Sequence, residues 1–224
     1  MIKLENNNSS FYDYIFPPIK RIKYVPNVEY ETNNILHTSG IVYGSIGSGK
    51  TELFRSITEK AVKKYSEERV SSCTSPQGSI RKLIFWGTRP KLVNLLYADD
   101  ITLRRIDKKV LSAYFKLRHI FKETWKINQG YILSMLGVHR FHSSPTELRT
   151  NMSFLIVKNI PSNPFDYSIM KKYLGEEHMK ILSNLERLRM KDPKYKKYSI
   201  YWIKTGEKGI LETKLARNNY VNTV

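Results

Sequence analysis

The sequence predicts an α/β fold in which a mainly parallel sheet carries helices on both faces. Short apolar runs, typical of buried strands, alternate along the chain with longer segments of helical composition. A glycine-rich loop joins one of these strands to one of the helices, and another strand ends in two adjacent acids. Strands that alternate with helices pair in parallel, because each helix crosses one face of the sheet before the next strand begins.

Length and composition predict a soluble, intracellular protein with one core. The chain has 224 residues, of which 41% are hydrophobic, and none of its apolar runs approaches the roughly 20 residues of a membrane-spanning helix. Residues 1–8 lack the charged-then-apolar layout of a secretion signal. The single cysteine, Cys73, excludes an internal disulfide and fits a reducing compartment.

A strong positive charge favours a polyanionic partner. Lys and Arg number 38 against 20 Asp and Glu, which gives a formal net charge of +18. Such a charge raises the local concentration of nucleic acid around a protein. The basic residues are spread along the chain and not gathered in one tail. A solvated basic surface without a nucleic-acid partner is the alternative interpretation.

We divide the chain into three parts. Residues 1–38 form an extension that we expect to be irregular, asparagine-rich at first and then aromatic and proline-containing. This extension packs either across a neighbouring molecule or over the surface of its own domain. Residues 39–160 form the α/β core, and residues 161–224 add a basic helix and a hairpin that pack on this core.

Hydrophobic periodicity and turn residues predict the individual elements. Strands are expected at residues 40–43, 82–86, 93–98, 131–138 and 152–157, helices at 52–69 and 107–128, and a polar loop at 71–78. Beyond the core, a helix is expected at 167–190, followed by a hairpin that pairs 198–204 with 210–214.

The glycine-rich loop has the GxxxxGK[ST] pattern of a phosphate-binding loop. It consists of Gly44, Ser45, Ile46, Gly47, Ser48, Gly49, Lys50 and Thr51. In such a loop, backbone N–H groups point at phosphate oxygens and the next helix adds its positive N-terminal end. We expect Lys50 to reach the β- and γ-phosphates of ATP and the Thr51 hydroxyl to bind Mg²⁺. The alternative is a plain glycine turn, but the predicted strand before the loop and helix after it favour nucleotide binding.

Asp99 and Asp100 follow a predicted apolar strand. Phosphoryl transfer needs a carboxylate for Mg²⁺ and a group that orients or deprotonates water, both at a strand end beside the phosphate loop. We predict that Asp99 holds Mg²⁺, directly or through water, and that Asp100 acts on the attacking water. Either acid can instead simply cap the next segment.

These motifs and their order resemble the ASCE division of P-loop ATPases, which have a RecA-like core. Within that division, the chain is similar to the FtsK/HerA superfamily, particularly to small viral genome-packaging ATPases of the poxvirus and archaeal-virus type. The resemblance covers residues 40–159. It is carried by residues 44–51, 95–100, 136–140 and 148–151.

The resemblance implies two further catalytic residues. In these ATPases a polar sensor, commonly Gln, ends the strand after the two acids, and His139 stands at that position, with Arg140 next to it. An arginine precedes the last core strand, and Arg149 matches it. Most relatives carry Glu at the position of Asp100, so the shorter side chain is a departure from the family pattern. The alternatives are that His139 or His142 only satisfies a loop hydrogen bond and that Arg149 pairs with a surface acid.

The resemblance also implies a motor that hydrolyses ATP and translocates double-stranded DNA. Subunits would form a ring, a hexamer in relatives, with DNA in the channel and a capsid or portal protein as a further partner. Seven basic residues are candidates for the channel surface: Lys82, Arg89, Lys91, Arg104, Arg105, Lys108 and Lys109. Trp86, Trp125 and Trp202 are expected in the core or an interface, not as base-stacking platforms.

Three alternative functions stay open at this stage. A plasmid-transfer ATPase of the same superfamily would use the same motor. A basic DNA-binding or virion protein could carry a silent phosphate loop, although intact Lys50, Thr51, Asp99 and Asp100 argue against it. A small-molecule kinase would need an arginine-rich lid and an acceptor pocket, and the long helix predicted after the two acids fits an ATPase better.

Overall fold

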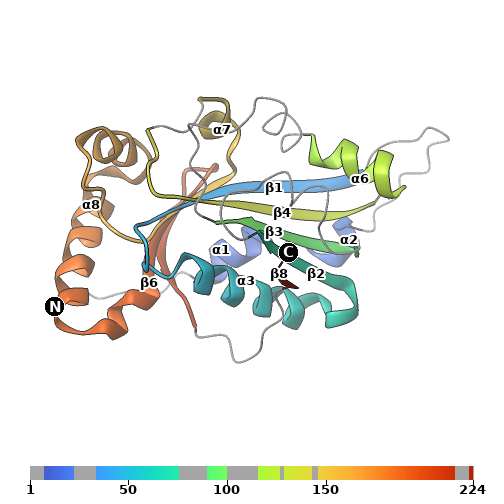
Figure 1. Ribbon diagram of the computed structural model, residues 1–224, viewed down its shortest axis with the longest axis horizontal. Helices are drawn as coiled ribbons and strands as arrows, with labels where there is room; N and C mark the ends of the chain where they lie inside the picture. The colour runs from blue at the N-terminus through green and yellow to red at the C-terminus, as the bar shows by residue number, and fades with distance from the viewer. Residues whose placement is uncertain are drawn as a thin grey trace.

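The computed structural model describes residues 8–22, 34–75, 90–99, 116–126, 129–142, 146–214 and 222–223. Within these residues the chain forms one eight-stranded sheet in the order β7-β6-β5-β1-β4-β3-β2-β8 (Figure 1). The strands are β1 Asn34–Tyr43, β2 Val70–Ser75, β3 Val93–Ala98, β4 Gln129–Val138, β5 Phe154–Val157, β6 Tyr198–Ile203, β7 Lys208–Glu212 and β8 Asn222–Thr223. The helices are α1 Asn8–Ile15, α2 Ile19–Ile22, α3 Lys50–Tyr65, α6 Leu117–Trp125, α7 Thr146–Asn151 and α8 Pro164–Lys191, with short 3₁₀ turns η1 Glu67–Arg69 and η3 Pro193–Lys197.

The centre of the sheet is parallel, as predicted. β1 pairs with β4 along its whole length, from Asn34 opposite Gln129 to Tyr43 opposite Val138. β5 pairs with the other side of β1, and its Val157 also lies opposite Tyr43. β3 pairs with β4 so that Ala98 lies opposite Leu136. The residues that follow β1, β3, β4 and β5 therefore meet at one edge of the sheet.

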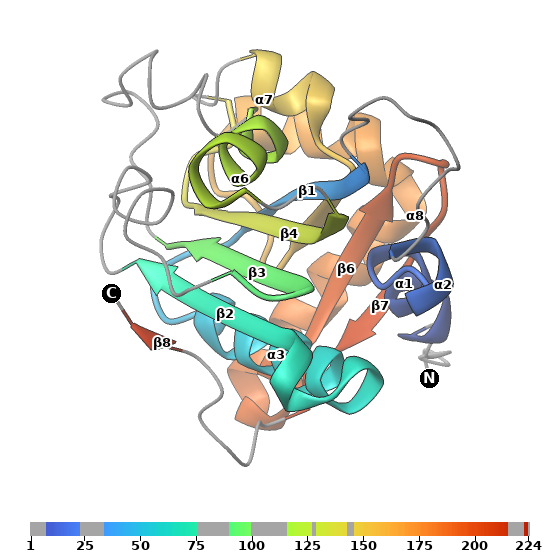
Figure 2. The ribbon, with the colours of Figure 1, turned by 90° about the vertical axis from the view of Figure 1, so that its right-hand side faces the viewer.

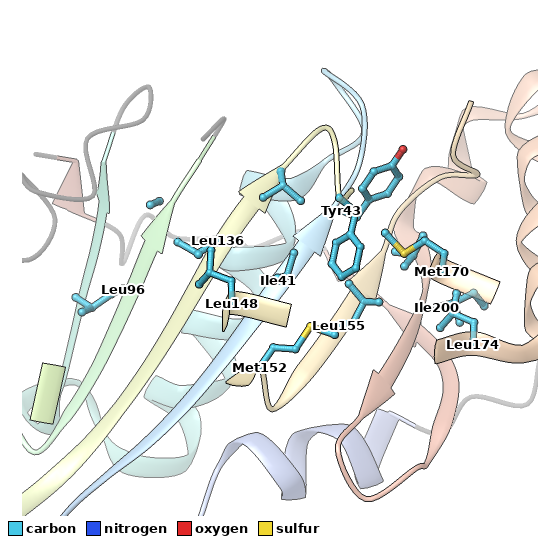
Figure 3. Packing of buried hydrophobic residues seen from close by; sticks show 14 of the residues in the cluster. Ile41, Tyr43, Leu96, Leu136, Leu148, Met152, Leu155, Met170, Leu174 and Ile200 are labelled. Carbon is cyan, nitrogen blue, oxygen red and sulfur yellow. The ribbon is translucent and has the colours of Figure 1, made fainter. Parts of the chain in front are cut away.

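Helices cover both faces of the sheet, which confirms the predicted fold class. Figure 2 shows α6, α7 and α8 on one face and α3 on the other. Alternate residues of β1 divide between the faces: Ile41 and Tyr43 pack toward α8, whereas Val42 packs toward α3. Figure 3 shows the α8 side, where Met170 and Leu174 lie close to the strands.

α3 is held firmly against the sheet by its apolar face. Leu53, Phe54 and Ile57 are fully buried, and the Phe54 ring stacks on Tyr97 of β3 with centroids 5.0 Å apart. Burial of each such side chain contributes roughly 1.5–3 kcal/mol. The start of α3, directly after the glycine-rich loop, is therefore fixed relative to the edge of the sheet.

The prediction of an irregular N-terminal extension is wrong for residues 8–22 and 34–38. Residues 8–15 and 19–22 form α1 and α2, and residues 34–38 begin β1. Phe11 and Ile15 are fully buried on one face of α1, and the Phe11 ring lies 5.1 Å from that of Tyr201 in β6. The described part of the extension thus packs over its own domain, since burial of this apolar face stabilises the helix.

The predicted polar loop at residues 71–78 is wrong for residues 71–75, which belong to β2. β2 pairs in parallel with β3, and the Ser71 hydroxyl donates to Asn94 Oδ1 of β3 at 2.7 Å. Ser72 and Thr74 are buried in spite of their polarity. Pairing with a neighbouring strand, which a local pattern cannot reveal, decides this element. Residues 76–78 and the predicted strand at 82–86 lie outside the described residues.

The helix expected at 52–69 is α3, which begins two residues earlier and ends at Tyr65, with residues 67–69 in the 3₁₀ turn η1. The remaining elements agree closely with the prediction. β3 has the expected bounds, and β4 begins two residues before its expected start. β5 begins at Phe154 and not at Met152, because the Met152 N–H still donates to Leu148 at the end of α7. Of the long helix expected at 107–128, the structure describes α6, and residues 107–115 and 127–128 lie outside the description.

The C-terminal part forms the expected helix and hairpin. Asn163 caps α8 through a 2.8 Å bond from the Phe165 N–H, and Gly175 kinks the helix with a φ of 77°. β6 pairs antiparallel with both β5 and β7, so the hairpin extends the main sheet. Across the described helices, none combines the length and apolar character that a bilayer-spanning helix requires.

Candidate nucleotide-binding site

The glycine-rich loop, residues 44–51, lies between the end of β1 and the start of α3, where the sequence predicts it; we call it the phosphate loop. The Gly44 N–H donates to Val138 at the end of β4, which fixes the loop to the strand edge. Gly47 and Gly49 have φ angles of 71° and 84°, which side chains with a Cβ rarely adopt. Because Gly49 is the N-cap of α3, the first amides of that helix carry no side-chain cap and its positive end faces the loop.

The Lys50 ammonium is held inside the phosphate loop. The side chain is almost fully buried, and Nζ donates to the carbonyl oxygens of Gly44 at 3.1 Å and Ser45 at 3.2 Å. A buried cation that is held by loop carbonyls lies next to the loop amides that would bind phosphate. Lys50 therefore takes the position that the motif predicts.

His139 packs against the same loop. Its Nδ1 lies 2.7 Å from Gly44 O and 3.5 Å from Lys50 Nζ. A carbonyl oxygen only accepts, so the shorter contact requires the proton on Nδ1, and the longer contact is then not a hydrogen bond. The structure thus brings His139 to the phosphate loop, and its next residue, Arg140, is exposed.

Asp99 lies at the end of β3 and faces the start of α3. The Thr51 hydroxyl donates to Asp99 Oδ2 at 2.6 Å, and the Tyr97 hydroxyl donates to Asp99 Oδ1 at 2.9 Å. Carboxylate and hydroxyl oxygens are hard ligands of the kind that Mg²⁺ takes, so Thr51 and Asp99 fit the predicted Mg²⁺ role. Asp100, the predicted base, lies outside the described residues.

Gly137 of β4 makes room for this carboxylate. A Cβ at this position would lie 2.6 Å from both Asp99 Oδ1 and the Tyr97 hydroxyl. Since both atoms are the ends of side chains, a larger residue would displace the carboxylate and leave the backbone in place. Tyr97 and Gly137 therefore position Asp99, and sequence analysis did not identify either of them.

Arg149 is not brought to the phosphate loop of its own chain. Its guanidinium donates to Thr146 within α7 at 3.2 Å. The end of α7 is fixed beside β1, where the Ser39 hydroxyl donates to the carbonyl oxygen of Asn151 at 3.1 Å. Ser39 precedes the end of β1 by four residues, or roughly 13 Å along the strand. The role that the resemblance implies for Arg149 is thus not supported within one subunit.

Two residues after β5 support the loop from its other side, and sequence analysis missed both. Asn159 Oδ1 accepts from the Ser45 N–H at 2.8 Å, and the Lys158 N–H donates to Tyr43 O at 2.9 Å. The Lys158 side chain is 2% exposed and its Nζ donates to Lys196 O at 3.2 Å. The sequence pattern that could have identified them is a pair of polar residues directly after an apolar core strand, the same pattern that identifies Asp99.

Burial, reinforced by the positive charge of Arg189, lowers the pKa of Lys158 to about 7. Between this value and the ordinary 10.5, the unfolded chain binds a proton that the folded chain lacks, so the free energy of unfolding rises with pH in this window. Below this pH window, Lys158 is protonated in both the folded and the unfolded chain, and the free-energy cost of burying its charge is fully present.

We expect Lys158→Met to remove this pH dependence. From about pH 7 to about pH 9, the wild type should gain on the order of 2 kcal/mol of unfolding free energy relative to the variant. Urea unfolding of both proteins at the two pH values measures the difference. Equal pH dependence of the two proteins would show that Lys158 keeps an ordinary pKa when folded.

The other candidate residues either make contacts that stabilise the fold or lie outside the residues that the structure describes. His142 bonds to the buried Asp166, with Nδ1 and Oδ1 2.8 Å apart, as the loop-hydrogen-bond alternative proposes. Trp202 packs against the hydrophobic core on the face of the sheet that α8 covers, with its ring 5.0 Å from that of Tyr173. This agrees with the expected place of Trp202 in the core. Of the seven predicted channel residues, the structure describes Lys91, whose Nζ donates to Glu67 O at 2.8 Å; the other six, together with Trp86 and the Trp125 side chain, lie outside.

Solved structures with the same arrangement include the genome packaging NTPase B204 from Sulfolobus turreted icosahedral virus 2. Its complex with AMPPCP matches with a TM-score of 0.52 and 10% identity, over 80% of this chain and 98% of B204. Its sulfate complex matches with a TM-score of 0.51 and 12% identity. The chain has the fold of a P-loop NTPase. The predicted resemblance to small viral genome-packaging ATPases is thus confirmed at the level of the fold.

Sequence comparisons add less. No protein-family profile matches the chain. The chromosomal replication initiator protein DnaA of Kosmotoga olearia is 24% identical over 198 residues, which cover 82% of this chain and 43% of DnaA. The chain therefore spans less than half the length of this curated relative.

Proposed function

We propose that this protein is an ATPase that uses ATP hydrolysis to translocate double-stranded DNA, and that it packages a viral genome. The observation that carries the proposal is the assembled site: Lys50 inside the phosphate loop and Asp99 bonded to Thr51. The likeness to B204 along nearly its whole length supports a packaging ATPase over other uses of the fold.

Each residue of the site has a separate role in ATP hydrolysis. The loop amides and the positive end of α3 bind the β-phosphate, and Lys50 balances the charge that develops on the γ-phosphate. Thr51 and Asp99 hold Mg²⁺, which neutralises phosphate charge when bound. Asp100 orients or deprotonates the attacking water.

We assign His139 the role of sensor in this mechanism. Its Nδ1–H bonds to Gly44 O of the phosphate loop, 2.7 Å away, so a change in the loop on nucleotide binding is transmitted to the end of β4. The neighbouring Arg140 is exposed and can respond to the same change. In this mechanism His139 replaces the glutamine that is common in the resembling ATPases.

The charge of the chain supports DNA as the substrate of translocation. A net charge of +18 favours contacts with the phosphate backbone, which are independent of base sequence. A motor that moves along any genome needs such contacts. Self-association into a ring would place DNA in a central channel, with a capsid or portal protein as the docking partner.

The proposal is tested by phosphate release with and without linear double-stranded DNA. We expect Mg²⁺-dependent ATP hydrolysis that DNA stimulates, and displacement of a third strand from a triplex as the motor passes. DNA affinity should fall steeply with salt and be nearly equal for unrelated sequences. DNA binding without hydrolysis would favour a non-enzymatic DNA-binding protein, and a strong preference for one short sequence would favour a regulator.

We predict that Gly137→Ala impairs the use of Mg²⁺ without unfolding the protein. The added Cβ displaces the Asp99 carboxylate, since it would lie 2.6 Å from Oδ1. Mutating a residue that orients a metal ligand typically costs roughly 10- to 100-fold in metal affinity or activity. Phosphate release measured across a Mg²⁺ titration should shift to higher concentration.

Tyr97→Phe is the milder companion variant, because it removes one hydrogen bond to Asp99 and adds no atoms. We expect a shift in the same direction but smaller. Circular dichroism should show the wild-type fold for both variants. A Gly137→Ala protein with the wild-type Mg²⁺ titration would mean that Asp99 does not hold the ion.

A further inference from the structure

A pocket of about 480 Å³ opens beside the phosphate loop, on the side of β5. Its inner wall is formed by Gly49 and Glu52 at the start of α3 and by Lys158 after β5. Its outer wall comes from the C-terminal part, from residues 193, 194, 196, 197 and 212–214. Its volume lies in the range of small-molecule sites, and no residue of the proposed mechanism other than Gly49 lines it.

The strand order decides which end of a nucleotide can face this pocket. Asp99 follows β3 and His139 follows β4, and both strands lie on the same side of β1. The Mg²⁺ and γ-phosphate end of the site is therefore on that side. Lys158 follows β5, on the opposite side of β1. A nucleotide bound along the loop directs its nucleoside toward β5, where the pocket lies.

The pocket is lined with groups that suit a nucleoside next to a phosphate. Five lysines and two glutamates line it, and Glu212 pairs with Lys197 at 2.5 Å, so its balance is positive. Lysine stems and Pro193 offer apolar surface on which a flat base can lie. A base needs apolar contact and its phosphate needs cations, and this pocket supplies both.

Lys158 stands at the junction of the pocket and the loop. A Cβ on Gly49 would lie 3.9 Å from its Nζ, so only the bare glycine separates the ammonium from the loop. The Arg189 charge repels this ammonium, and Glu52 attracts it more weakly. The positive end of α3 adds to this unbalanced charge. An anion at this point, such as the phosphate next to the ribose, would relieve it.

We propose that this pocket holds the base and ribose of the bound nucleoside triphosphate, with the Lys158 ammonium beside the phosphate nearest the ribose. The inference rests on the proposed function, because it assumes that the phosphate loop binds a nucleotide. It assigns part of the nucleotide site to the C-terminal helix and hairpin. It also gives the bond from Lys158 to Lys196 O a role, since that bond links the loop to the outer wall of the pocket.

A second, smaller pocket of about 250 Å³ over the tip of the phosphate loop is the rival location. Ile46 and Met190, which are 85% and 83% exposed, line it. Because this smaller pocket lies over the tip of the phosphate loop, a base bound in it would extend away from the larger pocket beside α3. The two pockets share Lys158 and Lys196, but Ile46 and Met190 line only the smaller one, so labelling at unshared residues can separate them.

Photolabelling of the full chain with 8-azido-ATP and Mg²⁺ locates the base directly. We expect adducts at Pro193, Lys194 or Lys197 or within residues 212–214, which line only the larger pocket, and we expect excess ATP to prevent them. ATP-protected adducts at Ile46 or Met190 would overturn the proposal, as would the lack of any protected adduct in a protein that hydrolyses ATP. A protein that neither binds nor hydrolyses ATP would overturn the proposed function and this inference with it.

The Lys158→Met variant tests the junction independently. We expect its affinity for AMPPCP, measured by calorimetry, to fall about tenfold, the loss of one charge-assisted contact. Lys63→Met is the matched control, because Lys63 lies on α3 with its side chain 72% exposed and pairs with Glu59; its affinity should be unchanged. Wild-type AMPPCP affinity in a folded Lys158→Met protein would exclude Lys158 from the site.

Discussion

Lys50→Ala should hydrolyse ATP at least roughly 10²- to 10³-fold more slowly than the wild type, the loss expected when one group that stabilises transition-state charge is removed. The ammonium of Lys50 is held within the phosphate loop by the carbonyl oxygens of Gly44 and Ser45. Charge grows on the transferred phosphoryl group during the reaction, and in the described part of the loop Lys50 is the side chain that carries a compensating charge.

The fold should survive this substitution. α3 is anchored by the buried Leu53, Phe54 and Ile57, which face the sheet and do not depend on the lysine. Lys63→Ala provides a control on the same helix, since the Lys63 side chain is 72% exposed and pairs with Glu59 on the helix surface. Phosphate release by the three proteins with DNA present is the measurement. Turnover of Lys50→Ala within about twofold of the wild type, with its fold intact, would remove the nucleotide-hydrolase assignment.

Strands with continuous apolar sequence could be predicted from the sequence almost to the residue. All six residues of β3 are buried, and a strand that is covered on both faces has this uniform pattern. Polar strands could not be predicted in the same way. The first half of β1 and most of β2 read as irregular segments, yet both form long parallel ladders.

These polar strands are stabilised by partners that are distant in sequence. His37 in β1 bonds to Ser134 in β4, with Nε2 and Oγ 2.7 Å apart. Burial and the nearby charge of Arg118 lower the pKa of His37 to about 4, so it is neutral and suits a buried strand. A pattern in one segment contains no information about such a partner, which is why residues 34–38 appeared to belong to the extension.

The candidate site could be predicted where one rule applies: the ends of parallel strands meet at one edge of the sheet. This rule places Asp99 and His139 at the phosphate loop, and the structure brings His139 to Lys50 and Asp99 to Thr51. The same rule applies to Lys158, which sequence analysis overlooked. Arg149 was assigned from resemblance alone, and within one chain it lies away from this edge.

Arg149→Ala should lose roughly 10³-fold or more in turnover, which is the second large effect that we expect. The end of α7 is fixed at Ser39, roughly 13 Å along β1 from the phosphate loop, so we expect Arg149 to act on a nucleotide across a subunit boundary. An arginine that acts on the transition state lowers kcat and leaves ATP affinity nearly normal.

Mixing two inactive variants tests this arrangement. In a ring built from Arg149→Ala and Lys50→Ala subunits, some boundaries combine the intact phosphate loop of one subunit with the intact arginine of the other. Such boundaries hydrolyse ATP if Arg149 acts on its neighbour's site, so partial recovery of phosphate release is the expected result. No recovery would mean that the arginine acts within its own subunit. Normal turnover of Arg149→Ala alone, with DNA present, would make Arg149 a structural residue that only joins the turns of α7 through Thr146.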